Sequence, residues 1–354
     1  AAGCRDGTGV AYVGIPGAQQ AWVHGGKPYA LNRHGTDTAA MVEGFFFGGS
    51  DAGLSAGERP NATPRDYPVF VPPGYDARTP MPVMVLLHGR PSNAAAMARI
   101  TDMNAVARRH GFIVVYPTQR MLRHTVNCWN SADPREQQRY AGEPALLAGV
   151  ARQVVETYNA DPARVHVVGA SSGAGTAVIL AATYPDVFAT VTSVAGGEYG
   201  LNQVAPDDPD STPPSYTARQ AWAQMGDRAR HVPLLVIQGE DDAVVPPLVA
   251  DRLVAHWTAV HDFVDDGLLN NSLQLVEATE TVPGVPGRHP YTKTTLTAAD
   301  GSSMVESYMV EGLGHAWPGP AGDGMFTDHA GPDASAAAWD FARRHPMSRS
   351  TATG

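Results

Sequence analysis

The amino-acid sequence predicts an α/β fold with a doubly wound, mostly parallel sheet. Its apolar runs at 82–87, 112–116 and 233–238 are almost continuous, as in strands that are covered on both faces of a sheet. Helix-like segments at 94–110 and 143–158 lie between such runs. Strands that alternate with helices are typical of a doubly wound sheet.

The remaining segments of the chain are assigned to further strands, a last helix and surface loops. Further strands are expected at 67–71, 165–168, 187–194 and 304–310, and a closing helix at 334–344. The polar, turn-rich residues 259–300 are expected to be irregular and to lie on the surface. We divide the chain into a Gly-rich N-terminal extension, residues 1–60, and one α/β domain, residues 61–354, on which the extension packs.

Composition excludes several classes of function. The formal net charge of −10, without any basic stripe, argues against nucleic acid as a partner, because nothing would neutralise phosphates. No apolar run approaches the about 18 residues of a membrane span. The chain begins at Ala1 without a methionine, which indicates signal removal and secretion, or a trimmed chain. Cys4 and Cys128 are the only cysteines, and either one disulfide or two separate thiols would fit.

A short turn between a predicted strand and a predicted helix carries the first chemical signal. Val165 to Val168 precede Gly169-Ala170-Ser171-Ser172-Gly173, and an Ala-rich segment follows. This order of strand, G-x-S-x-G and helix would expose the Ser171 hydroxyl above the sheet and offer the Ser172 N–H to an oxyanion. A turn without chemistry is the alternative reading. A phosphate-binding loop is disfavoured because no G-x-x-x-x-G-K-[ST] pattern is present.

A serine nucleophile needs a base and a carboxylate that orients the base. Three carboxylates follow the apolar run 233–238. Asp242 is preferred because its Asp-x-x-Val-Pro continuation resembles the acid loop of α/β-hydrolases, and Asp241 and Glu240 are its rivals. Of 13 histidines, His315 is preferred to His329 because glycines precede it and a Trp-Pro-Gly turn follows. The order Ser, Asp, His is that of α/β-hydrolases.

A second oxyanion donor is expected in the loop after an early strand. His88-Gly89-Arg90 directly follows the run 82–87. The backbone N–H of Arg90, together with that of Ser172, would therefore hold the developing negative oxygen.

Six segments carry a resemblance to a known family: Leu87-His88-Gly89, 111–117 (GFIVVYP), Cys128-Trp129-Asn130, the serine turn, 184–189 (YPDVFA) and 311–319 (EGLGHAWPG). From about residue 65 to 345, the chain resembles the extracellular poly(3-hydroxybutyrate) depolymerase and esterase family of α/β-hydrolases. The resemblance implies the α/β-hydrolase fold, a catalytic triad of Ser171, Asp242 and His315, and no metal or organic cofactor.

This chain departs from the family pattern in two respects, which concern the disulfide and the substrate. Family members often carry a cysteine where this chain has Arg90, so the resemblance makes Cys4 the replacement disulfide partner of Cys128. Many polymer-degrading members also append a polymer-binding domain after the catalytic helix. This chain ends soon after that helix, which favours soluble or amorphous polyester, or oligomers, over a crystalline solid.

The sequence thus predicts a secreted serine esterase that hydrolyses a poly(3-hydroxybutyrate)-type polyester or its oligomers. Trp129, Trp317, His88 and Tyr199 are expected to bind substrate, since they lie in or near the motif loops. The alternatives are a feruloyl or acetylxylan esterase, a hydrolase of a polyamide or aromatic polyester, and a non-catalytic binding protein on the same fold. The sequence makes no prediction of oligomeric state.

Overall fold

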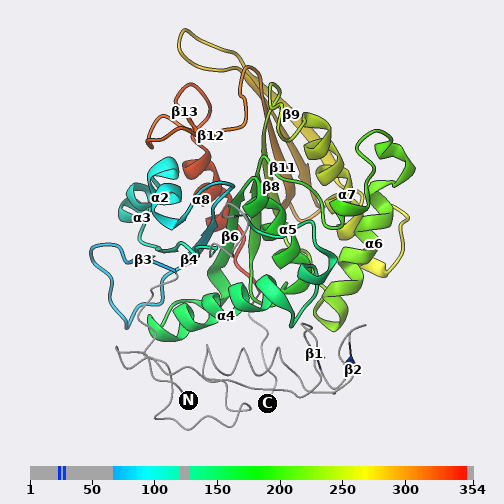
Figure 1. Ribbon diagram of the computed structural model, residues 1–354, viewed down its shortest axis with the longest axis horizontal. Coiled ribbons are helices and arrows are strands. Elements are labelled where there is room, and N and C mark those ends of the chain that lie inside the picture. The colour runs from blue at the N-terminus through cyan, green and yellow to red at the C-terminus, as the bar shows by residue number, and fades with distance from the viewer. Residues whose placement is uncertain (1–22, 25–26, 29–66, 120–127, 349–354) are drawn as a thin grey trace.

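The computed structural model describes residues 67–119 and 128–348, together with two short paired strands, β1 (Val23–His24) and β2 (Lys27–Pro28). The rest of the N-terminal extension that we assigned to residues 1–60 lies outside the described residues. In the described part, one large sheet is covered by helices on both faces (Figure 1).

Nine strands form this sheet, and the described residues contain seven α-helices. The strands are β3 (Val69–Phe70), β4 (Val83–Leu87), β5 (Ile113–Val115), β6 (Val165–Ala170), β7 (Thr190–Val194), β8 (Leu234–Gly239), β9 (Val276–Val282), β10 (Tyr291–Thr297) and β11 (Ser303–Val310). The helices are α2 (Ala94–Thr101), α3 (Met103–His110), α4 (Gly142–Thr157), α5 (Ser172–Thr183), α6 (Pro214–Met225), α7 (Pro247–Asp266) and α8 (Ala334–Arg344). A separate short pair consists of β12 (Trp317–Pro318) and β13 (Thr327–Asp328).

The sheet is parallel in its centre and antiparallel at its edges. The strand order is β3-β5-β4-β6-β7-β8-β11-β10-β9. The six strands from β5 to β11 in this order pair in parallel, whereas β3, β10 and β9 pair antiparallel with their neighbours. The predicted doubly wound, mostly parallel sheet is therefore confirmed.

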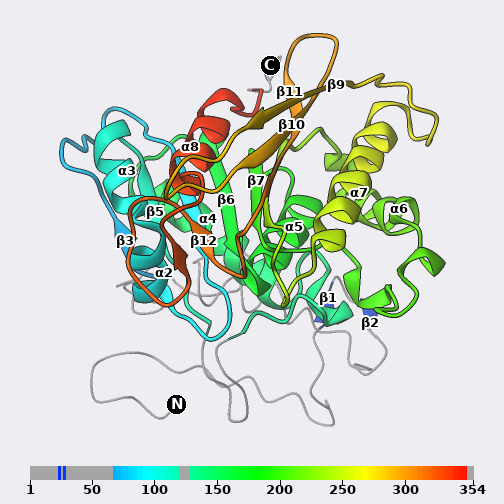
Figure 2. The same cartoon turned by 90° about the horizontal axis from the view of Figure 1, so that it is seen from above.

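Each central strand contributes side chains to two separate cores. In β4, Val83, Val85 and Leu87 pack with α4, α5, α6 and α7, whereas Met84 and Leu86 pack with α2, α3 and α8. All five of these side chains are completely buried. This explains the continuous apolar runs, because every residue of such a strand faces a helix layer (Figures 1 and 2).

The helix expected at 94–110 is interrupted. Asp102 adopts a left-handed conformation with φ 45°, and it ends α2 and precedes α3. A carboxylate residue tolerates this conformation better than most side chains, and no proline or glycine marks the break in the sequence. The expectation of one continuous helix is wrong at this residue.

Residues 259–300 are largely regular, which contradicts the irregular surface segment that we expected. Helix α7 continues to Asp266, and β9 pairs with β10 along seven residues on each strand. Almost every residue of β9 is exposed on both faces, so the strand lacks the apolar alternation that identifies half-buried strands. Backbone pairing with β10, which itself pairs with β11, holds this edge in place.

Candidate active site

Ser171 lies in a sharp turn between β6 and α5, at φ 54° and ψ −120°. The strand and the helix approach each other so closely that only glycine fits on either side. A Cβ on Gly169 would lie 2.1 Å from the Gly173 carbonyl oxygen, and a Cβ on Gly173 would lie 2.4 Å from the Leu87 carbonyl oxygen. The turn therefore holds the serine at the carboxyl end of the strand, in a backbone conformation that a non-glycine residue adopts only under constraint.

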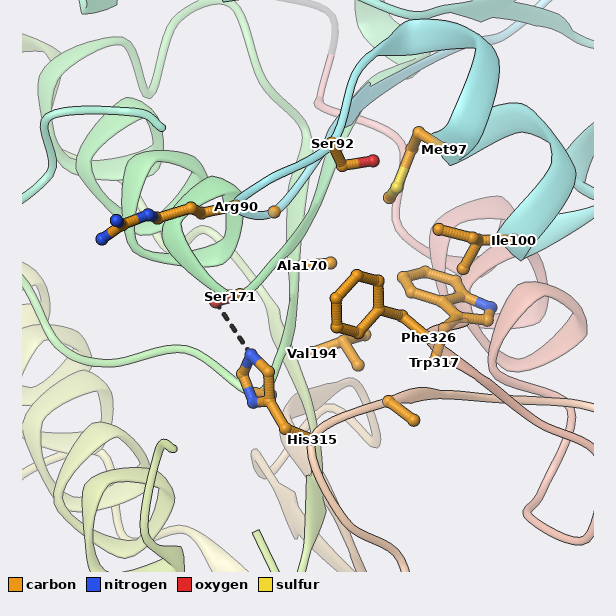
Figure 3. A pocket seen from close by; sticks show the side chains of 13 residues that line it. Arg90, Ser92, Met97, Ile100, Ala170, Ser171, Val194, His315, Trp317 and Phe326 are labelled. Carbon is orange, nitrogen blue, oxygen red and sulfur yellow. Dashed lines mark hydrogen bonds between the residues drawn. The ribbon is translucent and has the colours of Figure 1, made fainter. Parts of the chain in front are cut away.

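The imidazole of His315 connects Ser171 to Asp242. His315 Nε2 lies 3.0 Å from Ser171 Oγ (Figure 3), and His315 Nδ1 lies 2.7 Å from Asp242 Oδ2. The three residues follow β6, β8 and β11, which are parallel members of the same sheet. Because the carboxyl ends of parallel strands share one edge, loops that are far apart in the sequence converge there.

Asp242 is held in place by its own loop. Its side chain is completely buried, and Oδ1 accepts hydrogen bonds of 2.8 Å from the backbone N–H groups of Val244 and Val245. Oδ2 is thereby directed at His315. Its two rivals, Asp241 and Glu240, are exposed, so the structure distinguishes Asp242 from its acidic neighbours.

An apolar pocket opens beside Ser171 and His315. Figure 3 shows the side chains of Met97, Ile100, Trp317 and Phe326 gathered on one side of the two polar residues. Helix α2 supplies the first two of these side chains, and the β12–β13 region supplies the other two. Sequence reasoning did not identify Met97, Ile100 or Phe326, because nothing in an ordinary amphipathic helix or a loop phenylalanine marks a pocket wall.

A second hollow also touches Ser171, and its lining is more polar. Ser131, Ser172, Glu198 and Asn202 line it together with the glycines 196 and 197. Ser171 therefore lies where an apolar and a more polar recess meet. Such an arrangement can hold the two halves of an ester whose groups differ in polarity.

The predicted substrate-binding residues divide into two groups. Trp317 lines the apolar pocket, and its indole N–H donates to Ser335 Oγ at 3.2 Å. By contrast, the structure places the side chains of His88, Trp129 and Tyr199 in the interior, outside both recesses. The polar tips of these three side chains bond to backbone groups instead, as buried amphipathic side chains generally do.

The two expected oxyanion donors lie on either side of the serine turn. Arg90 lines the pocket next to Gly89, where an added Cβ would lie 3.1 Å from Ser171 Cβ. Ser172 is the first residue of α5, so its N–H has no acceptor within the helix and lies at the positive end of the helix dipole. The guanidinium of Arg90 points away from the apolar pocket (Figure 3).

The structure gives no support to the predicted disulfide. Cys128 has a free thiol that lies 3.4 Å from the Trp129 carbonyl oxygen, and Cys4 lies outside the described residues. The Cys4–Cys128 bond therefore stays a prediction. Across residues 67–119 and 128–348, no group of three or more His, Cys, Asp or Glu side chains is arranged to hold a metal ion, and no helix there is long and apolar enough to cross a membrane.

A buried network of hydrogen bonds centres on the Glu143 carboxylate, which the sequence analysis did not identify. Glu143 accepts hydrogen bonds from the Asn130 backbone N–H at 2.9 Å, from the Asn130 side-chain amide at 2.6 Å, and from the Gln119 side-chain amide. Its own backbone N–H donates to Glu136 Oε2 at 2.5 Å. Burial raises the pKa of Glu143 to about 7, and the nearby Glu136 carboxylate adds to this shift.

This raised pKa predicts how stability changes with pH. The folded protein binds the Glu143 proton more tightly than the unfolded chain, so the stabilisation is complete below about pH 4.5 and is lost as pH rises through about 7. Glu143→Gln cannot ionise, and we expect its free energy of unfolding to fall less between about pH 5 and pH 8 than that of the wild type. Urea unfolding at both pH values checks this.

The matched control for that experiment is Glu156→Gln. Glu156 is exposed on the same helix, α4. Its replacement is expected to leave the pH dependence of stability unchanged. Equal pH dependence in the wild type and Glu143→Gln would show that this carboxyl is not the group that titrates.

Comparisons with known proteins match this chain to esterases and to a depolymerase. Residues 65–272 match the family model described as "Esterase PHB depolymerase". Poly(3-hydroxyalkanoate) depolymerase C of Paucimonas lemoignei is 30% identical over 72% of this chain, which spans 59% of that relative's length. Feruloyl esterase B of Neurospora crassa is 29% identical over 67% of this chain and 78% of the relative.

A solved structure, acetyl xylan esterase from Aspergillus awamori, shares the fold. It aligns with a TM-score of 0.55 at 21% identity and covers 70% of this chain and 88% of that one. At this level of identity the likeness concerns the fold alone. Together with the sheet topology, it confirms the predicted α/β-hydrolase fold.

Proposed function

The chain belongs to the PHB depolymerase family of esterases, and from this premise we propose that it is a serine hydrolase of carboxylic esters. The observation that carries the proposal is the unbroken series of hydrogen bonds from Ser171 through His315 to Asp242. A serine hydroxyl is a weak nucleophile without a base, and an imidazole held by a carboxylate is the base that activates it.

The proposed reaction has two halves. Ser171 Oγ attacks the ester carbonyl carbon while His315 Nε2 takes the hydroxyl proton, and Asp242 stabilises the resulting imidazolium. The backbone N–H groups of Arg90 and Ser172 stabilise the tetrahedral oxygen. His315 then gives its proton to the departing alkoxide, which leaves an acyl group on Ser171. In the second half, a water molecule deprotonated by His315 attacks the acyl-enzyme, and Ser171 regains its proton as the acid departs.

The proposed substrate is a poly(3-hydroxybutyrate)-type polyester or its oligomers. The apolar recess of Met97, Ile100, Trp317 and Phe326 fits a short aliphatic group, and the more polar recess fits a chain that continues with further ester groups. The likeness to a poly(3-hydroxyalkanoate) depolymerase supports this choice. A polymer outside the cell cannot cross a membrane, so for such a substrate the proposal places the enzyme outside the cytoplasm.

The second candidate is a feruloyl or acetylxylan esterase. The aromatic side chains Trp317 and Phe326 in the apolar recess also suit a planar hydroxycinnamoyl group, and relatives with both names match the chain. Hydrolysis of a polyamide or an aromatic polyester would use the same nucleophile with a different fit in the two recesses.

A product screen distinguishes these substrates. The purified protein is incubated with amorphous poly(3-hydroxybutyrate), a hydroxybutyrate trimer, methyl ferulate and acetylated xylan. We expect the highest turnover on the trimer and the polyester, with hydroxybutyrate oligomers as products. Preferential release of ferulate or acetate would refute the polyester proposal and favour the second candidate. A fluorophosphonate probe is expected to label Ser171, and failure to label it would refute the serine mechanism itself.

A further inference from the structure

The ring of His88 is enclosed in the interior directly behind the serine turn. The residue has no exposed surface, and the ring lies 5.3 Å from the indole of Trp129, centroid to centroid. Its Nδ1 lies 2.9 Å from the Gly89 carbonyl oxygen, and its Nε2 lies 3.1 Å from the Gln119 backbone nitrogen. The ring therefore has a polar contact at each nitrogen and is not available to substrate.

These two contacts determine which nitrogen carries the proton. The backbone N–H of Gln119 can only donate, so Nε2 of His88 must be the acceptor and carry no proton. Nδ1 then carries the proton and donates to the Gly89 carbonyl oxygen. Burial lowers the pKa of His88, which keeps the ring in this neutral form.

The Gly89 carbonyl belongs to the same peptide group as the Arg90 N–H. A peptide group is planar, and in its trans form the C=O and N–H point in opposite directions; the cis peptide bond of this loop is the following one, Arg90–Pro91. A donor on the oxygen therefore fixes the direction of the N–H on the other side. It also polarises the group and strengthens that N–H as a donor.

We propose that His88 is a positioning residue for ester hydrolysis, because its Nδ1–H holds the Gly89–Arg90 peptide so that the Arg90 N–H faces the oxyanion. This inference rests on the proposed function. Trp129 helps to hold the backbone of His88 in place, since its indole N–H donates to the His88 carbonyl oxygen at 2.8 Å. Gln119 completes it by selecting the tautomer, and its side chain is itself anchored on Glu143.

Two substitutions separate this role from simple packing. In His88→Asn, the side-chain N–H₂ lies where Nδ1 was and can still donate to the Gly89 carbonyl, but the acceptor for Gln119 is lost. In His88→Gln, the side-chain oxygen can reach the place of Nε2 and accept from Gln119, but the donor to Gly89 is lost. The pair thus removes one contact at a time.

We expect His88→Gln to lower kcat for p-nitrophenyl butyrate by about 10- to 100-fold, part of the loss caused by removing one oxyanion donor, with KM changed little. Its affinity for a boronic acid that mimics the tetrahedral intermediate should fall by a similar factor. His88→Asn should keep most of the kcat and of the boronate affinity. The reverse order, or equal losses in both variants together with a lower Tm, would overturn the inference.

A measurement on the unmodified protein keeps the test decisive if either variant folds poorly. In ¹⁵N-histidine-labelled protein, the His88 ring should show a protonated Nδ1 and an unprotonated Nε2, and a proton on Nε2 would overturn the inference. Retention of full activity by Ser171→Ala would instead refute the proposed function, so the two failures are distinguishable.

Discussion

Ser171→Ala is expected to lower kcat toward a soluble ester such as p-nitrophenyl butyrate by about 10⁵- to 10⁶-fold, as the loss of a serine nucleophile does in other hydrolases. In the proposed mechanism, the hydroxyl that lies 3.0 Å from His315 Nε2 is the atom that forms the acyl-enzyme. Without it, His315 can activate only water, and the oxyanion donors and the binding recesses supply the residual rate. Steady-state kinetics on the variant check this expectation.

Ser193→Ala is the matched control for this experiment. Ser193 is buried on the neighbouring strand β7, and within the part of the chain that the structure describes its hydroxyl has no hydrogen-bond partner. Its loss should leave kcat close to that of the wild type. The fluorophosphonate probe should label Ser193→Ala but not Ser171→Ala. Labelling of the Ser171 variant at another serine, with activity retained, would place the nucleophile elsewhere.

The convergence of Ser171, Asp242 and His315 could be predicted from the sequence because each lies just after a recognisable apolar run. Parallel strands present their carboxyl ends at one edge, so residues in these positions meet whatever the loops between them contain. The choice of Asp242 over Asp241 depends on more than position. The N–H groups of Val244 and Val245 hold Asp242, and the trace of this loop in the sequence is the Asp-x-x-Val-Pro continuation.

The strands β9 and β10 were not predicted from the sequence, and both were missed for the same physical reason. The edge strand β9 is exposed on both faces, and its partner β10 is half-buried throughout, so neither shows the apolar alternation on which strand prediction depends. Their structure comes from backbone pairing with a neighbour rather than from burial. The break in the helix at Asp102 also depends on tertiary structure. Asp102 is a non-glycine residue with a left-handed backbone, and the packing of α2 and α3 on the sheet imposes this conformation.

The residues that line the two recesses were the least predictable part of the site. His88, Trp129 and Tyr199 lie in or near motif loops, but a loop position does not reveal which way its side chain points. In the structure Tyr199 donates to the Gln137 carbonyl oxygen at 2.8 Å and fills the core. The walls of the apolar recess come instead from side chains such as Met97, whose spacing in α2 is that of any core-facing helix.

Asp242→Asn is expected to lower kcat by about 10⁴-fold, because the amide forces His315 into the wrong tautomer. The loop itself determines how the new side chain is oriented. Two backbone N–H groups donate to Oδ1 of Asp242, and only the amide oxygen of asparagine can accept them. The NH₂ group must then face His315 Nδ1, which becomes the acceptor, and the ring proton moves to Nε2. In that form Nε2 cannot accept the proton of Ser171.

Asp241→Asn provides the comparison, since it makes the same chemical change on the exposed neighbouring residue. It should retain kcat within about twofold, as surface substitutions away from a site generally do. Both variants should unfold at similar urea concentrations, because asparagine can keep both of the loop hydrogen bonds that hold residue 242. If Asp242→Asn kept its activity while Asp241→Asn lost it, the orienting carboxylate would be Asp241, and the loop would have to rearrange when substrate binds.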